Sequence, residues 1–346
     1  MGFFDNKSII VTGATGLIAS HLIKTIMDSG NPNIIAVSRS EDKLEDIFKD
    51  YIKKDNFKII AQDIFIPLPE FEQHIDFIFH AASPISSAII KTKPVSVIEP
   101  NIVGTMNCLN FLKKQKEESG ENGRLIVFSS ATVYGNTGDE DILVSENETS
   151  IADALDAPNI PYSESKRMVE TIARAYQKQY DIDVVIARFG YLYGYSYFAP
   201  NTAFYEFVRK ALNGENIELN SPDIARRDNI YVDDAISGII YLCEQGLAGE
   251  VYNVSTAKEL QNFAAADEIA IEISKIVNDL YGLQTEVKYL NGQKAKRKPG
   301  IALDNSKLKA LGWKPKFNLN MGIKNTIMQY RDQDEYNEGT TCIWKK

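Results

Sequence analysis

The sequence predicts an α/β protein, a doubly wound parallel sheet with a smaller, irregular lobe toward the C-terminus. Through the first half, short apolar runs alternate with segments in which apolar residues recur at helical spacing. Strands that are apolar along their whole length are typical of a parallel sheet covered by helices on both faces. From about Phe189 this alternation stops, and aromatic residues, Pro and Gly crowd residues 191–200.

The individual elements follow from the same periodicities. Helices are expected over residues 17–27, 97–112 and 163–180, and residues 233–243 are expected to return to the main layer from the second lobe. The last residues, 334–346, are polar and without period, which predicts a frayed tail. The strands are expected at residues 9–11, 34–37, 58–60, 77–79, 125–128 and 184–187.

Composition excludes several classes of function. The chain of 346 residues carries a net charge of −9, which disfavours general binding of nucleic acid or acidic membranes. No run approaches the roughly 20 apolar residues of a membrane span. The three cysteines, Cys108, Cys243 and Cys342, lie too far apart for a metal site or a disulfide framework. We therefore expect a cytoplasmic protein without a metal.

The first strand leads into a Gly-rich turn that predicts a phosphate site. Gly13 permits a tight turn, and Gly16 lets a pyrophosphate approach the N-terminus of the next helix, where free N–H groups favour anions. Ala19 stands where a third Gly often allows close helix packing. An ordinary turn is the alternative, but the position in a first βαβ unit favours a dinucleotide. The expected contacts are Gly13, Thr15, Gly16, Leu17 and Ile18.

The end of the second strand bears on the choice of cofactor. A carboxylate there would bind the ribose of NAD, but the chain has Arg39 between two serines. A cation suits the 2′-phosphate, so NADP is favoured over NAD, unless Arg39 is only a solvated surface residue. Asp63, beside Ile64, is expected to accept a hydrogen bond from the adenine amino group, or else to form a turn.

Three side chains predict proton and hydride chemistry at an alcohol. Tyr162 and Lys166 are four residues apart and share one face of a predicted helix, and Ser130 ends a predicted strand. A phenol can take the proton of an alcohol near neutral pH if an adjacent ammonium stabilises its phenolate. Ser130 would hydrogen-bond the reacting oxygen. A surface helix and a polar loop are the alternative.

Together with further segments, these motifs identify a family resemblance. The chain resembles the extended short-chain dehydrogenase/reductase family, in its nucleotide-sugar epimerase/dehydratase branch. The resemblance implies a Rossmann-type fold, with Ala81 and Ala82 beside the cofactor and an Arg at position 227 that meets the substrate diphosphate. The further matching segments are residues 80–83, 101–105, 227–234, 252–254, 297–300 and 311–315.

The substrate half agrees in part with this branch. Arg227 and Arg297 could clamp a diphosphate, although ion pairs with Asp228, Asp233 or Asp234 are the structural alternative. The family's dehydratases have an Asp-Glu pair where this chain has Ala131 and Thr132, which disfavours dehydration. Tyr191 replaces a usual substrate-binding Asn, and Asn229 replaces an aromatic residue. The expected substrate residues are Thr132, Tyr191, Arg227 and Arg297.

The sequence therefore predicts an NAD(P)-dependent enzyme that acts at C4 of a nucleotide sugar, first of all as an epimerase. An NADPH-dependent 4-keto-sugar reductase, an oxidase or decarboxylase, and a non-catalytic cofactor-binding scaffold stay as alternatives. The expected domains are a dinucleotide-binding domain at 1–188, with returning segments near 228–256, and a substrate lobe at 189–333. A homodimer is expected, and the apolar faces of the helices at 97–112 and 163–180 could form its interface, although burial in the core explains those faces too.

Overall fold

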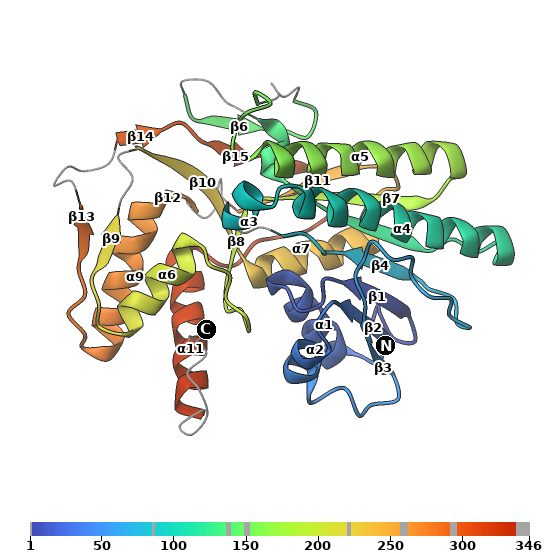
Figure 1. The fold of residues 1–346 in the computed structure, drawn as a ribbon, viewed down its shortest axis with the longest axis horizontal. Coiled ribbons are helices and arrows are strands. Elements are labelled where there is room, and N and C mark those ends of the chain that lie inside the picture. The colour runs from blue at the N-terminus through green and yellow to red at the C-terminus, as the bar shows by residue number, and fades with distance from the viewer. Residues whose placement is uncertain are drawn as a thin grey trace.

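A parallel sheet of seven strands carries the N-terminal part of the chain (Figure 1). The computed structural model describes residues 2–84, 87–135, 140–148, 153–219, 223–256, 262–290 and 296–336. The strand order is β11-β7-β5-β4-β1-β2-β3, and every pair is parallel. The strands are β1 (Ser8–Thr12), β2 (Asn33–Ser38), β3 (Phe57–Ala61), β4 (Phe77–His80), β5 (Arg124–Ser130), β7 (Asp183–Phe189) and β11 (Val251–Val254).

Helices cover both faces of this sheet. In β1, Ile9 and Val11 join one apolar core, whereas Ile10 between them joins the other. The first core includes α1 (Leu17–Ser29), α2 (Glu41–Phe48) and α7 (Val232–Gln245). The second includes α4 (Val95–Ser119) and α5 (Ile160–Tyr180). The predicted Rossmann-type doubly wound sheet is thus confirmed.

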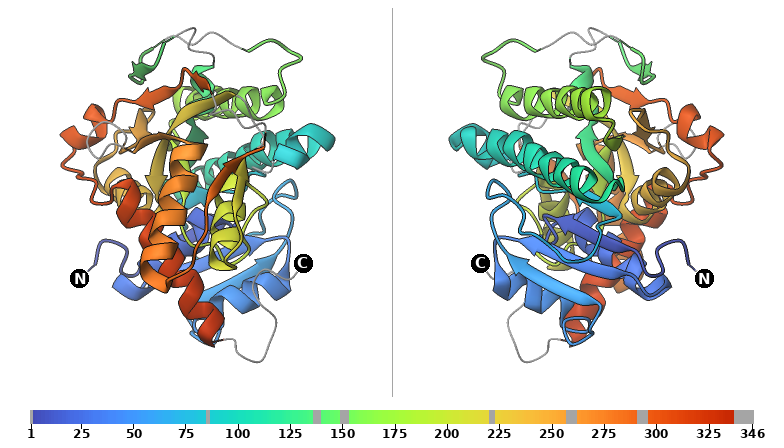
Figure 2. Two further views of the ribbon diagram at one scale, coloured as in Figure 1. Left: turned by 90° about the vertical axis from the view of Figure 1, so that its left-hand side faces the viewer. Right: turned by 90° about the vertical axis from the view of Figure 1, so that its right-hand side faces the viewer.

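The second lobe is built around β10 (Asp223–Tyr231), which pairs with three short strands, one antiparallel and two parallel. In the left view of Figure 2, the helices of this lobe stand in front of the sheet domain. Another strand pair, β6 (Ile142–Val144) with β15 (Ile301–Leu303), joins segments far apart in sequence. The lobe's other elements are β8 (Tyr191–Tyr193), α6 (Ala203–Leu212), β9 (Ile217–Leu219), β12 (Phe263–Ala265), α9 (Ala266–Tyr281), β13 (Val287–Tyr289), β14 (Lys296–Lys298), α10 (Ser306–Ala310) and α11 (Leu319–Tyr336).

Several predicted elements are longer than their apolar pattern. The predicted helices at 97–112 and 163–180 belong to α4 and α5, which begin earlier, and α4 also ends later. The predicted return of residues 233–243 corresponds to α7, which packs against α1. The tail was expected from Asp334, but α11 continues to Tyr336, and residues 337–346 lie outside the described part. In that described part, no helix is long and apolar enough to cross a bilayer.

Candidate active site

The Gly-rich turn lies where the ends of β1, β2 and β4 meet. Gly13 has φ +65°, and a Cβ there would lie 2.7 Å from the backbone of Ala82. The amide of Ala14 donates to the Val37 carbonyl at 3.1 Å. Gly16 precedes α1, and no side chain caps the first N–H groups of this helix. The turn therefore fits a pyrophosphate, which would bind those N–H groups.

The segment expected near the adenosine ribose, residues 38–40, contains one exposed arginine and two serines that form hydrogen bonds within the protein. Arg39 is exposed and makes no hydrogen bond or ion pair to any described residue. The Ser38 hydroxyl instead meets the Thr15 hydroxyl at 2.9 Å. Ser40 caps α2, where its hydroxyl accepts the Lys43 amide at 3.4 Å. Of the two serines that flank the cation, one thus contacts the Gly-rich turn and the other holds a helix.

The expected adenine contacts follow β3 and β4. Asp63 is half-buried and accepts the Phe65 amide at 3.5 Å, as in the turn-forming alternative. Ile64 is buried. Ala81 and Ala82 are half-buried beside Gly13, so they line the same edge of the sheet as the turn.

His80 joins three elements behind this edge. Its Nδ1 lies 2.8 Å from the Thr12 hydroxyl and its Nε2 lies 3.2 Å from the Pro100 carbonyl in α4. Burial, with a smaller effect from the nearby Lys166, lowers the pKa of His80 to about 3. The imidazole is therefore neutral near pH 7. Its contacts with β1 and α4 indicate a structural role beside the expected cofactor site.

The three predicted catalytic residues come together. Ser130 ends β5, and its side chain lies close enough to the Tyr162 hydroxyl to lower the pKa of that phenol. The Lys166 ammonium lies 5.8 Å from the centre of the Tyr162 ring and donates to the Phe128 carbonyl at 2.7 Å. α4 fixes this part of α5, because Asn101 donates to the Ser165 hydroxyl at 2.9 Å. The cluster thus places a phenol, a hydroxyl and an amine at the carboxyl end of the sheet.

Burial opposes charge at both titratable members of the cluster. It raises the pKa of the Tyr162 phenol, and the Ser130 side chain lowers that pKa by a smaller amount. Burial lowers the pKa of Lys166 to about 7, against the opposing effect of Glu170. The protonation state of Lys166 is thus finely balanced near neutral pH.

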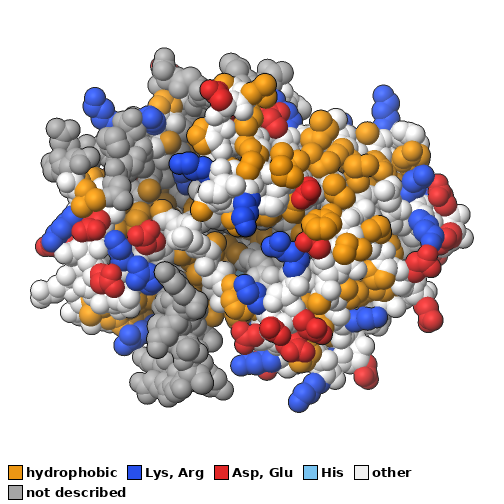
Figure 3. Space-filling view, in the orientation of Figure 1, with side chains coloured by type: hydrophobic (Ala, Val, Ile, Leu, Met, Phe, Trp, Pro, Cys, Tyr) orange, Lys and Arg blue, Asp and Glu red, His pale blue; other side chains and the backbone are white. Residues whose placement is uncertain are grey.

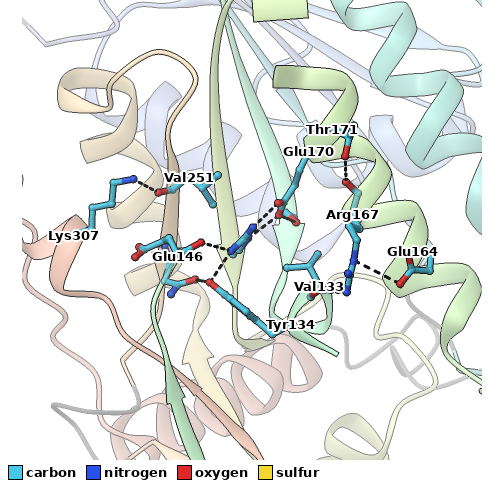
Figure 4. A network of polar contacts seen from close by, with 12 residues as sticks. Val133, Tyr134, Glu146, Glu164, Arg167, Glu170, Thr171, Val251 and Lys307 are labelled. Atoms are coloured by element: carbon cyan, nitrogen blue, oxygen red, sulfur yellow. Dashed lines mark hydrogen bonds and ion pairs between the residues drawn. The ribbon is translucent and has the colours of Figure 1, made fainter. Parts of the chain in front are cut away.

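A buried polar network behind this cluster has no counterpart in the sequence prediction (Figure 4). Arg188 donates to both carboxylate oxygens of Glu170, at 2.9 and 2.6 Å, and to the Tyr134 hydroxyl at 2.8 Å. Tyr134 in turn donates to Asn253 at 2.8 Å. One available indication was spacing, since Tyr162, Lys166 and Glu170 follow one another at intervals of four on one helix face.

On the substrate side, Arg227 has no acidic partner among the described residues. Its guanidinium lies 5.2 Å from the centre of the Tyr191 ring, and no ion pair joins it to a described residue. The Tyr191 hydroxyl donates to Thr202 at 3.5 Å. Arg227 and Tyr191 both line a small pocket, together with Phe204 and Phe207 of α6. Figure 3 shows Lys and Arg side chains gathered around the hollow between the two lobes.

Arg297 differs from Arg227 because two carboxylates hold it. It pairs with Asp267 at the start of α9 and lies 3.3 Å from Glu268, which also pairs with Arg226 at 3.2 Å. Arg297 thus forms ion pairs within the protein, as the structural alternative expects, but its partners are Asp267 and Glu268 and not Asp228, Asp233 or Asp234. Asp228 instead accepts the Ser255 hydroxyl at 2.5 Å and the Leu303 amide at 2.7 Å.

Asn229 and Thr132 also occupy defined places. Asn229 is fully buried, and its amide donates to the carbonyls of Arg227 and Asn262 at 2.8 and 2.9 Å, so it ties β10 to the segment before β12. Thr132 follows Ser130 in the short 3₁₀ helix η1 (Ala131–Tyr134). Its hydroxyl oxygen is buried and has no described hydrogen-bond partner. No group of three or more potential metal ligands occurs among the described residues.

Comparison with known proteins gives this geometry a context. A model of the NAD dependent epimerase/dehydratase family matches residues 9–255. UDP-glucuronic acid decarboxylase 6 of Arabidopsis thaliana is 29% identical over 93% of this chain and 88% of its own. Human dTDP-D-glucose 4,6-dehydratase is 26% identical over 94% of this chain and 90% of its own. The structure of UDP-glucuronic acid 4-epimerase from Bacillus cereus, with UDP-glucuronic acid and NAD, superposes with a TM-score of 0.75 at 23% identity, over 94% of this chain and 99% of that one.

Proposed function

Because the chain belongs to the NAD dependent epimerase/dehydratase family, we propose that it inverts C4 of a nucleotide sugar through a transient 4-keto sugar. The Ser130–Tyr162–Lys166 cluster carries this proposal. At the two positions after Ser130 the chain has Ala131 and Thr132, so no carboxylic acid stands there to expel a hydroxyl. Similar proteins are named as an epimerase, a dehydratase and a decarboxylase of nucleotide sugars.

The residues of the chain would divide the proton chemistry between them. A nicotinamide cofactor, held through its pyrophosphate at the turn of Gly13 and Gly16, would supply a reversible hydride acceptor for C4. Tyr162 would take the C4 hydroxyl proton and give it back, and Ser130 would orient the same oxygen. Lys166, as an ammonium, would stabilise the Tyr162 phenolate. The unpartnered Thr132 hydroxyl lies next in sequence and would hydrogen-bond a sugar oxygen.

Arg227 would hold the substrate diphosphate. No acidic residue of the described part pairs with it, which supports this role, because binding a phosphate then breaks no ion pair within that part. Arg297 would join it only after release from Asp267 and Glu268. We propose Tyr191 as a platform that orients Arg227 beside the sugar site.

The exposed side chains of Val103, Met106 and Met168 on α4 and α5 support the expected homodimer.

The cofactor is proposed to be NADP in preference to NAD, on the evidence of Arg39. Removal of a charged hydrogen bond weakens binding by about 1.5–3 kcal/mol. Arg39→Ala should therefore weaken NADP binding by that amount and change NAD binding little. Titration calorimetry with both cofactors measures the difference. Equal losses, or NAD retained by the purified protein, would refute the preference.

Hydride accounting separates the proposed epimerase from its rivals. An epimerase returns the same hydride, so we expect a product of unchanged mass from a matching nucleotide sugar, with no net use of cofactor. A panel of UDP-, dTDP-, GDP- and CDP-sugars, UDP-glucuronic acid included, is incubated with the protein and analysed by mass spectrometry and NMR. Stoichiometric consumption of NADPH and two added hydrogens would show a reductase instead.

The decarboxylase is the second candidate, because the Arabidopsis relative covers nearly the whole chain. Oxidation of a sugar acid at C4 places the keto group β to the C5 carboxylate, which then leaves as CO2. Loss of the mass of CO2 from UDP-glucuronic acid in the same panel would establish this activity. Loss of water would establish a dehydratase, contrary to the inference from Ala131 and Thr132.

A further inference from the structure

The carboxylate of Glu170 occupies a central place behind the catalytic cluster. Glu170 lies one helical turn beyond Lys166, and their Cβ atoms are therefore roughly 6 Å apart. It is 7% exposed, and Ser129 donates to its Oε1 at 2.5 Å. Arg188 donates two more hydrogen bonds to it. Among the described residues, the carboxylate thus accepts three hydrogen bonds and forms an ion pair with one guanidinium.

The register of the sheet gives these bonds a direct connection to the site. Ser129 of β5 and Arg188 of β7 are register partners, and Ser130 with Phe189 is the next pair. Glu170 therefore holds the two strands together at the pair immediately before Ser130. Without those bonds, the pair immediately before Ser130 would lose the side-chain anchor that Ser129 and Arg188 share.

Arg188 extends the same network to the far end of η1. Its Nη1 donates to the Tyr134 hydroxyl at 2.8 Å and to the Glu146 carbonyl at 3.2 Å. Tyr134 ends η1, while Ser130 caps its start by accepting the Thr132 amide at 3.3 Å. The helical turn that carries Thr132 is thus fixed at both ends, and Arg188 supplies one of the two anchors.

Few titratable groups of the described residues besides Glu170 face the Lys166 ammonium. The titratable groups that face Lys166 are Tyr162 and Glu170 on its own helix and His80 on β4. His80 is neutral near pH 7, as its pKa of about 3 requires. Among the described residues, Glu170 is thus the negative charge that favours the ammonium form of Lys166.

We propose that Glu170 is a positioning residue for the reaction, one that sets Ser130 through Ser129 and Arg188 and compensates the ammonium charge of Lys166. This role rests on the proposed function of the Ser130–Tyr162–Lys166 cluster. Glu170 touches no reacting atom. It acts in two ways: it anchors the ends of β5 and β7, and it places a negative charge near Lys166 on α5.

The first test is the titration of Lys166, which needs no substrate. Lysine labelled with ¹³C at Cε is followed by NMR against pH, and the Lys166 signal is the one that Lys166→Met removes. Glu170→Gln keeps the shape of the side chain and deletes its charge. We expect the Lys166 pKa to fall by about one unit, and Glu170→Asp to restore most of it.

Glu164→Gln is the matched control. It removes a carboxylate from the same helix, one that is 39% exposed and lies 3.6 Å from Arg167, and we expect it to leave the Lys166 titration unchanged. An unchanged Lys166 pKa in a folded Glu170→Gln protein would overturn the proposal. So would an equal fall in the Glu164→Gln protein.

Two further measurements keep the result decisive. If Glu170→Gln alone does not fold, the Glu170→Gln/Arg188→Gln pair leaves no unpaired buried charge, and the same downward shift is expected. Once a substrate is known, the high-pH limb of kcat should move to lower pH in Glu170→Gln, because Lys166 loses its proton earlier. A shifted Lys166 pKa without any C4 chemistry would uphold the electrostatic role and refute the proposed function.

Discussion

Tyr162→Phe is expected to lower turnover by about 10²–10⁴ while cofactor affinity stays near that of the unmodified protein. The change removes the group that would exchange the C4 proton and keeps the ring beside Lys166. Single-turnover measurements of C4 oxidation, read as reduced-cofactor absorbance, provide the rate. Fluorescence of bound reduced cofactor provides the affinity.

Tyr176→Phe is the matched control for this variant. Tyr176 lies on the same helix, and its hydroxyl donates to Asn110 at 2.8 Å, away from the cluster. We expect this variant to turn over at the normal rate. Near-normal turnover of Tyr162→Phe would remove Tyr162 from the mechanism, and equal losses in both variants would indicate a general effect on the helix.

Gly13→Ala is expected to destabilise the fold by about 2–5 kcal/mol and to abolish measurable cofactor binding. A positive φ costs a residue with a Cβ about 1–2 kcal/mol, and overpacking adds about 1–3 kcal/mol. At Gly13 both apply, since φ is +65° and the new Cβ would meet the Ala82 backbone at 2.7 Å. Chemical denaturation and calorimetric titration of the cofactor measure the two effects.

Gly120→Ala separates these two causes. Gly120 follows α4 with φ +76°, and nothing lies within 4 Å of the position that its Cβ would take. We expect only the conformational cost, about 1–2 kcal/mol, and normal cofactor binding. A Gly13→Ala protein that is no less stable than Gly120→Ala would show that the turn moves freely from β4.

The sheet was predictable because its strands are apolar along their whole length. In β1 and β2, side chains on both faces are buried, and a pattern of this kind has few interpretations besides a covered parallel sheet. The limits of α4 and α5 were less evident. The last turn of α4 is polar and mostly exposed, so the apolar period there gives no information about where the helix ends.

The catalytic cluster was predictable from spacing, but the charges around it were not. Tyr162 and Lys166 share a face by helix geometry alone. The partners of Arg297 lie about thirty residues away at the start of α9, and only the folded lobe brings them together. The pairing of Glu170 with Arg188 likewise crosses from a helix to a strand, so no local pattern reveals it.

The paired strands β6 and β15 have a consequence for how the chain can be divided. β6 precedes the last strands of the sheet in sequence, yet its partner lies in the final fifty residues, and Asn253 of β11 donates to the carbonyls of both Val144 and Asp304 at 3.1 Å. A fragment cut after Phe189 would expose β7 as a bare sheet edge and would leave β6 unpaired. The complementary fragment would carry β11 and α7 without the layer on which they pack. The two lobes are therefore spatially distinct but interlocked, and neither is a self-contained module that could be exchanged between proteins by joining segments of chain end to end.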